Sequence, residues 1–285
     1  MATTDNRQPL IWSRRDIEQR FGFQGGRFTR VNTLLSMLCA AVATIAIYSA
    51  VVFWPGENFV RPIFMDRGFT PYVMTFLFSW ALVIIAIKWS KLRFQRQSLS
   101  INVIPSNPDF VLSVVTVEQV LSTVMRSVDD SRSFVVFNRV FTALSNLRNL
   151  GRIADVDEML RSQAELDENG METSYSLLRG FIWAIPVLGF IGTVMGLSIA
   201  IGGFGEVLAT TTDPSALSDS LKGVTGGLST AFETTLLALI FALMLQLAVT
   251  FLHKAEQEFL DECTEYCQKN IVGKLRMMPF DTQTD

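Results

Sequence analysis

Residues 181–204 read FIWAIPVLGFIGTVMGLSIAIGGF and contain no charged side chain. An α-helix needs about 20 apolar residues to cross a bilayer core of about 30 Å, so this tract is long enough to span a membrane. Three further tracts have the same character: 31–54 has no charge, 72–89 has only Lys88, and 226–252 has only Glu233. We therefore expect an all-α membrane protein with four transmembrane helices. Four such tracts exclude a soluble enzyme, a disordered chain and a secreted disulfide scaffold.

The segments between these tracts differ in their content of lysine and arginine, which concentrate on the cytoplasmic side of a membrane. Six arginines lie in the first 30 residues and three basic residues lie in 91–96, whereas Lys222 is the only basic residue in 205–225. This distribution predicts that both termini and the central segment are cytoplasmic. The predicted order is a cytoplasmic N-terminal segment (1–30), TM1 (31–54), TM2 (72–89), a cytoplasmic helical region (90–180), TM3 (181–204), a periplasmic loop (205–225), TM4 (226–252), and a cytoplasmic C-terminal helix and tail (253–285).

The central segment is predicted to be helical because its apolar residues recur at intervals of three and four. This spacing gives one apolar face to 114–128 and another to 134–150, and an acidic, polar stretch follows in 155–178. Residues 253–275 are expected to extend the fourth membrane helix. The charged side chains of the central helices form either a solvated face or a contact with another protein. They are Arg126, Asp129, Asp130, Arg132, Arg139, Arg148, Arg152, Asp155, Asp157 and Glu158.

Small residues recur at helical spacing in the third and fourth tracts, whereas the first two tracts consist mainly of large apolar residues. Small side chains on one face let membrane helices approach closely, and Gly192 and Gly196 have the spacing of a helix-dimer motif. We expect these two helices to form an inner ring and the other two an outer ring. The small residues are Gly189, Thr193, Gly196, Ala200 and Gly203 in the third tract, and Gly227, Ala231, Thr235, Ala238 and Ala242 in the fourth.

Threonines on these two tracts are candidates for an ion path. Thr193 and Thr235 lie on the small faces, and Thr230 and Thr234 lie near Thr235 on the same helix. Each hydroxyl either lines a path for water or ions, or bonds its own helix backbone four residues earlier.

Glu233 is the only acid in any tract, and a carboxylate inside a membrane is costly. It either takes part in ion transfer, or is an acid near the start of a helix that the helix dipole favours, or pairs with Lys222 of a neighbour. Pro186 removes one hydrogen bond from the third helix and is either a static kink or a hinge.

Other chemistry is not indicated. The sequence contains no phosphate loop, no nucleophile–base pair and no metal-ligand cluster, so we expect no enzyme, no cofactor and no metal site. A net charge of −3 is unfavourable for a nucleic-acid surface.

Two of the stretches already described resemble a family of ion-driven membrane motors. AIPVLGFIGTVMG at 184–196 is similar to the third membrane helix of MotA, and GFIGTVMG at 189–196 is similar to the GxxGTVxG segment of TolQ and ExbB. GLSTAFETTL at 227–236 resembles the last helix of these proteins. The resemblance covers about 180–255, and the four-helix layout is similar to that of MotA.

The resemblance implies a homopentamer in the bacterial inner membrane around two copies of a single-helix partner of the MotB, ExbD or TolR kind. That partner would supply the ion-binding aspartate, Thr193 and Thr235 would face it, and Pro186 would be the hinge. By this resemblance, Thr230 stands where ExbB-like proteins carry a glutamate, and Glu233, three residues later, would be its substitute on an adjoining face.

The transported ion would be H⁺ or Na⁺, and a cytoplasmic rotor or effector protein is a further partner that the resemblance suggests. The driven system is a flagellum, a TolQ/ExbB-type outer-membrane system, gliding or phage defence. The alternative outside this class is a membrane scaffold that does not conduct ions.

Overall fold

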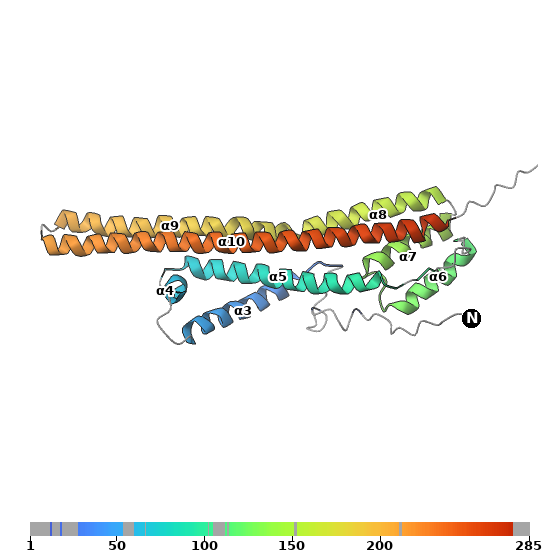
Figure 1. The fold of residues 1–285 in the computed structure, drawn as a ribbon, viewed down its shortest axis with the longest axis horizontal. Helices are drawn as coiled ribbons and strands as arrows, with labels where there is room; N and C mark the ends of the chain where they lie inside the picture. Colours follow the sequence, from blue (N-terminus) through green and yellow to red (C-terminus); the bar gives the residue numbers. More distant parts are fainter. Residues whose placement is uncertain are drawn as a thin grey trace, which may run out of the picture. The chain divides into compact units, whose positions relative to one another are not determined.

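The computed structural model describes residues 12, 18, 28–53, 60–65, 67–101, 103–104, 112, 114–150, 153–210 and 213–275. In these ranges the chain is almost entirely helical and contains no strand, which confirms the expected all-α fold (Figure 1). The helices are α3 (Thr33–Phe53), α4 (Val60–Met65), α5 (Thr70–Ser98), α6 (Val114–Ser127), α7 (Val135–Leu150), α8 (Ile153–Ser174), α9 (Ser176–Thr210), α10 (Pro214–Asn270) and the short 3₁₀ helix η1 (Val272–Lys274).

Four helices are long and apolar enough to cross a membrane: α3, α5, α9 and α10. Even the shortest, α3, has 21 residues, which corresponds to about 30 Å at 1.5 Å per residue. Each of the four charge-poor tracts in the sequence lies within one of these helices, apart from one or two residues at the ends of the first tract. Four long apolar helices fit a protein that crosses the membrane several times.

The helices differ from the tracts in length. Most of the segment 205–225, expected as a loop, is helical, because α9 continues to Thr210 and α10 begins at Pro214. Proline fits the first position of a helix, where its missing N–H is not needed. Asp213 caps this start by accepting hydrogen bonds from the Ser215 backbone N–H at 3.0 Å and hydroxyl at 2.8 Å. These bonds, the backbone one foremost, lower the pKa of Asp213. The charged residues that flank a tract show where a helix leaves the membrane, but they do not show where the helix ends.

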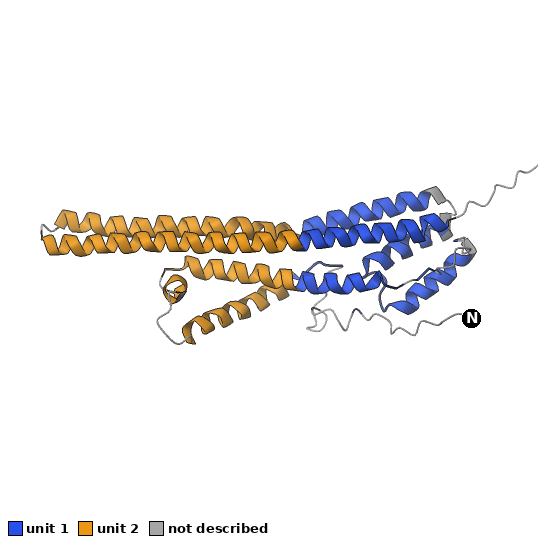
Figure 2. Ribbon diagram, in the orientation of Figure 1, with its two compact units in different colours: residues 1–32, 87–174, 252–285 blue, residues 33–86, 175–251 orange. Residues whose placement is uncertain are grey.

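The chain divides into two compact units (Figure 2). Unit 2 comprises residues 33–86 and 175–251, and therefore α3, α4, the first part of α5, α9 and most of α10. Aromatic rings join its helices: Phe78 stacks on Phe241 with ring centroids 4.2 Å apart, and Trp80 lies 5.0 Å from Phe181. The indole N–H of Trp80 also donates to the Ser36 hydroxyl at 3.0 Å, which connects α5 to α3. These contacts hold α5 against both α3 and the α9–α10 pair.

Large apolar side chains cover the outside of unit 2. On α9, Phe190 and Ile199 are 66% and 73% exposed, and on α10 Phe232 and Phe251 are 64% and 68% exposed. Exposed apolar surface of this extent is unfavourable in water and is what lipid or neighbouring subunits cover. The surface of unit 2 is therefore that of a membrane domain.

Unit 1 comprises residues 1–32, 87–174 and 252–285 and has an aromatic core. The rings of Trp12, Phe94, Phe134 and Phe137 form a chain of contacts with centroids 5.2 to 5.6 Å apart. The predicted helices of the central segment are confirmed as α6, α7 and α8.

Several ion pairs are buried in the described part of unit 1, among them one between Lys91 Nζ and Glu18 Oε2 at 2.6 Å. Lys88 Nζ is 3.1 Å from Glu256 Oε1, and Arg139 Nε donates to Asp167 Oδ2 at 2.7 Å, with all four side chains at most 3% exposed. Burial of Arg139 corrects one expectation from the sequence, which grouped it with charges that face water or another protein. Arg148 and Arg152 belong to the same group, and their side chains lie outside the described part of the chain.

Candidate functional site

The small faces of α9 and α10 pack against each other within one chain, and we call this contact the α9–α10 seam. Gly189 faces Ala238 so closely that a Cβ atom added to Gly189 would overlap the Ala238 Cβ. Towards the other end, a Cβ on Gly227 would overlap that of Ala200, and one on Gly196 would lie 3.3 Å from the Gly227 carbonyl oxygen. The order of these contacts makes the two helices antiparallel. Backbones come this near only where side chains are absent or consist of one methyl group.

Thr193 and Thr235 meet in the middle of the seam. Their hydroxyls are hydrogen-bonded to each other, and both are half-buried. Each hydroxyl also lies within hydrogen-bond distance of the same two carbonyls: Gly189 O at 3.2 and 3.3 Å, and Ala231 O at 3.2 Å for both. The structure therefore brings together two threonines that lie 42 residues apart in the sequence.

This pair has spare capacity for hydrogen bonding. Each hydroxyl has one proton to donate and two lone pairs that accept. Two hydroxyls and two backbone carbonyls thus offer more acceptors than donors at one place in an apolar helix pair. Such a group can coordinate a small cation or accept a hydrogen bond from a protonated carboxyl group.

Thr234 does not join the pair, although it is adjacent to Thr235. Its side chain is fully buried, and its hydroxyl bonds the carbonyls of Thr230 and Ala231 on its own helix, both at 3.0 Å. It packs against Gly192, where an added Cβ would lie 3.1 Å from the Thr234 hydroxyl and 2.9 Å from that of Thr70. Thr234 therefore has the contacts of a packing residue.

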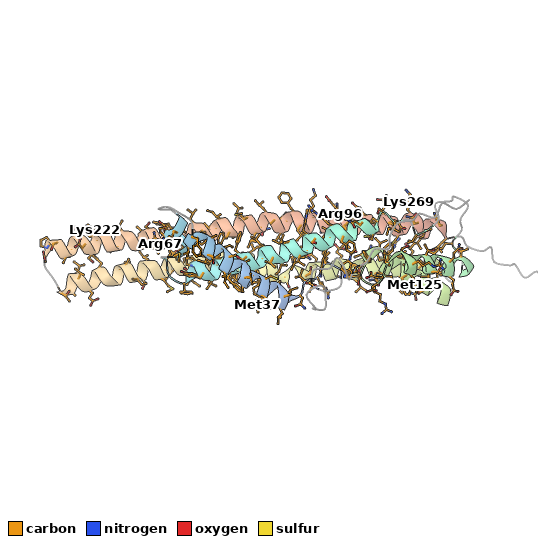
Figure 3. The ribbon with its side chains drawn as sticks, turned by 90° about the horizontal axis from the view of Figure 1, so that it is seen from below. Met37, Arg67, Arg96, Met125, Lys222 and Lys269 are labelled. Atoms are coloured by element: carbon orange, nitrogen blue, oxygen red, sulfur yellow. The ribbon has the colours of Figure 1, made fainter. Side chains whose placement is uncertain are left out.

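Glu233 forms an ion pair with Arg67, which lies in the connection between α4 and α5. Arg67 is labelled in Figure 3. Arg67 Nε and Nη2 lie 2.9 and 2.7 Å from Glu233 Oε2, and Arg67 Nη1 donates to the Thr230 hydroxyl at 2.5 Å. Within this chain, Lys222 bonds Asp219 on its own helix at 2.9 Å, and pairing of Glu233 with Lys222 of a neighbouring subunit stays a prediction. Glu233 also lies 19 residues after the first residue of α10, so it is not an acid at a helix start.

A cavity of about 220 Å³ lies beside this ion pair. Its walls include the small residues Gly192, Gly196 and Gly227, together with Arg67 and Thr230. The sequence analysis did not select Arg67, because its partner is 166 residues away in the chain. The available signal was an arginine shortly before the second membrane tract, together with the one acid of the fourth tract.

Pro186 lies within α9, which continues on both sides of it. Its role as a hinge stays a prediction. Among the described residues, no group of three histidine, cysteine or acidic side chains is arranged to hold a metal ion. Cys263 and Cys267 are buried free thiols in the C-terminal part of α10, and burial raises the pKa of Cys267 to about 11.

Comparison with known proteins gives one match. Residues 135–265 match the family described as the MotA/TolQ/ExbB proton channel family. Neither the curated proteins nor the solved structures give a match to this chain. The matched range contains α9, the Thr193–Thr235 pair and the part of α10 that packs on them. Across residues 135–265, somewhat less than half of its length, the chain is therefore similar to the MotA/TolQ/ExbB proton channel family.

Proposed function

We propose that this chain is the ion-conducting stator subunit of a membrane motor. It couples the flow of H⁺ or Na⁺ across the bacterial inner membrane to rotation or other mechanical work. The observation that supports this most directly is the Thr193–Thr235 hydroxyl pair at the centre of a seam built from glycine and alanine. This group offers more hydrogen-bond acceptors than donors inside the membrane, which suits contact with a cation or a protonated carboxyl group.

The chain needs a partner to complete the ion path. Glu233 is the only acid in the four tracts, and Arg67 neutralises it. We propose that two copies of a single-helix partner of the MotB, ExbD or TolR kind bring the carboxylate that takes up the ion. In this arrangement five copies of the chain surround the partner, and the threonine pairs face its carboxylate in turn. Both termini and the helices α6 to α8 are on the cytoplasmic side, where a rotor or effector protein would bind.

The energy available fits such a step. One elementary charge that moves through 100 mV releases about 2.3 kcal/mol, which is enough to bias a two-state motion by more than tenfold. Four membrane-crossing helices favour the MotA-like stator over the three-helix arrangement of TolQ and ExbB.

The test uses valine substitutions, which remove a hydroxyl and keep the shape of threonine. Thr193→Val and Thr235→Val are made in the complex with the single-helix partner, and ion flux is measured in proteoliposomes with a pH-sensitive or Na⁺-sensitive dye. Thr44→Val is the matched control, because Thr44 is a half-buried membrane threonine of α3 whose hydroxyl bonds the Ala40 carbonyl of its own helix at 2.8 Å.

Flux is expected to disappear in the two seam variants and to persist in the control. Assembly, followed by size-exclusion chromatography, is expected to survive in all three, since a single side-chain hydrogen bond in a membrane protein contributes only about 0.6 kcal/mol on average. Wild-type flux in both seam variants would contradict the proposed path.

A further inference from the structure

We propose that Arg67 is a positioning residue of the ion path: it fixes Glu233 as a permanent counter-ion, so that Glu233 does not carry the transported ion. This inference rests on the proposed function and assigns a role to a residue that belongs to neither α9 nor α10. It also separates Glu233 from the Thr193–Thr235 pair in function.

All three nitrogens of the Arg67 guanidinium make polar contacts. Nε and Nη2 lie 2.9 and 2.7 Å from one carboxylate oxygen of Glu233, and Nη1 donates to the Thr230 hydroxyl at 2.5 Å. The other carboxylate oxygen, Oε1, accepts a hydrogen bond from the Ser229 hydroxyl at 2.9 Å. Both oxygens of Glu233 therefore have partners, and a transported ion would compete with them for the carboxylate.

The backbone before α5 is shaped for this contact. Gly68 has a φ of +78°, a conformation that side chains with a Cβ disfavour, and it turns the chain between Arg67 and the start of α5. Thr70, the first residue of α5, is 3% exposed and packs against Gly192 of α9. The turn is thus anchored on one side of the cavity, and Arg67 reaches across to α10 on the other.

Among the described side chains of unit 2, Glu233 pairs with Arg67. The described charged side chains of unit 2 are Arg61, Arg67, Arg179, Glu206, Asp213, Asp219, Lys222 and Glu233. Lys222 is bonded to Asp219, and the residues that α9 contributes to the cavity beside Glu233 are glycine, methionine and isoleucine, none of which titrates. Arg67 is therefore the cation that neutralises Glu233.

Because Arg67 and Glu233 are largely shielded from water, the loss of either one is costly. The Arg67 and Glu233 side chains are 19% and 21% exposed, so removal of either leaves a charge with little water around it. An unpaired carboxylate at this place would exchange protons and attract cations, and would compete with the carboxylate of the partner. When Arg67 is lost, we expect the unpaired Glu233 carboxylate to trap ions beside the path. When Arg67 and Glu233 are both replaced, we expect no such trap.

The experiment compares Arg67→Gln, Glu233→Gln and the double variant in the complex used for the flux measurement. The readout is the ratio of variant to wild-type flux between about pH 5 and pH 8. Lys222→Gln is the control, because it removes an ion pair whose side chains are both 76% exposed. Its ratio is expected to stay near one.

Arg67→Gln is expected to lower the flux about tenfold, because it leaves the half-buried Glu233 carboxylate without this cation, and the ratio is expected to change with pH. The double variant is expected to return to within about threefold of wild type and to lose that pH dependence, because neither charge is left unpaired. A pH-independent ratio for Arg67→Gln, or a double variant no better than Arg67→Gln, would overturn the inference.

Thermal unfolding of the same proteins in detergent tests the pair without reference to flux. The double variant is expected to be more stable than either single variant, and simple additivity of the two losses would overturn the pairing. A wild-type complex that conducts no ions would instead contradict the proposed function, and the unfolding result would still decide whether Arg67 and Glu233 act as a unit.

Discussion

Gly189→Ala is expected to weaken the α9–α10 seam on which the ion path depends. The added methyl carbon would overlap the Cβ of Ala238 and would lie 3.4 Å from the Cα of Thr235, which belongs to the backbone and has little freedom to move. An extra carbon in a well-packed interior costs about 1 to 3 kcal/mol. We expect a loss of this size in the free energy of unfolding.

Gly180→Ala is the matched control on the same helix. An added Cβ there meets no atom within 4 Å, and alanine is favoured over glycine inside a helix by about 1 kcal/mol. The control is therefore expected to be as stable as wild type or slightly more stable. The measurement is unfolding of the detergent-solubilised protein by sodium dodecyl sulfate, followed by circular dichroism.

A second substitution makes the test specific to this contact. Ala238→Gly removes the methyl group that the new one would meet, so the double variant Gly189→Ala/Ala238→Gly moves the methyl from α10 to α9. We expect the double variant to lie within about 1 kcal/mol of wild type. The reasoning is refuted if Gly189→Ala is as stable as Gly180→Ala, or if Ala238→Gly fails to restore the loss.

Three further predictions concern other parts of the chain. Pro186→Ala is expected to slow the mechanical output of the motor while assembly persists, because it removes the break in the hydrogen bonds of α9; unchanged output would leave Pro186 as a static kink. Lys88→Met is expected to cost about 3 to 5 kcal/mol, since it removes one partner of a buried ion pair, and adding Glu256→Met should recover much of this loss. Lys254→Met removes the exposed lysine of the Lys254–Glu258 pair and should change stability by less than about 0.5 kcal/mol. A loss as large as that of Lys88→Met would refute the role of burial. Burial raises the pKa of Cys267 from 9.0 to about 11, so the folded chain keeps this thiol neutral where the unfolded chain ionises it, and stability is expected to fall as the pH rises from about 9 to 11. Maleimide labelling of Cys267 near pH 8 should be slow in the folded protein and fast in dodecyl sulfate. Fast labelling of Cys267 in the folded protein would contradict its burial.

The membrane helices could be predicted from the sequence because bilayer thickness and the cost of charge in lipid leave a clear pattern. The pattern of charge-free tracts identifies the residues that lipid covers. Residues 226–252 lie within α10, but the pattern cannot show that this helix runs from Pro214 to Asn270. Beyond the lipid, helix ends depend on local capping, as at Asp213.

The candidate site could be predicted only in part. Helical spacing identified Thr193 and Thr235 as residues on small faces, and the structure brings their hydroxyls together. The spacing of residues along one helix does not show which residue of a distant segment contacts that helix. The pairing of Arg67 with Glu233 was missed for this reason, and the burial of Arg139 against Asp167 was missed for the same one.

The most direct test of the central claim is ion flux through the purified complex of this chain with its single-helix partner in proteoliposomes. With a membrane potential applied, the account predicts flux of H⁺ or Na⁺ through the complex, and none when the membrane aspartate of the partner is replaced by asparagine. Flux that persists without this aspartate would contradict the division of labour between the two proteins. Absence of flux in both complexes would show that the chain is a scaffold and not a channel.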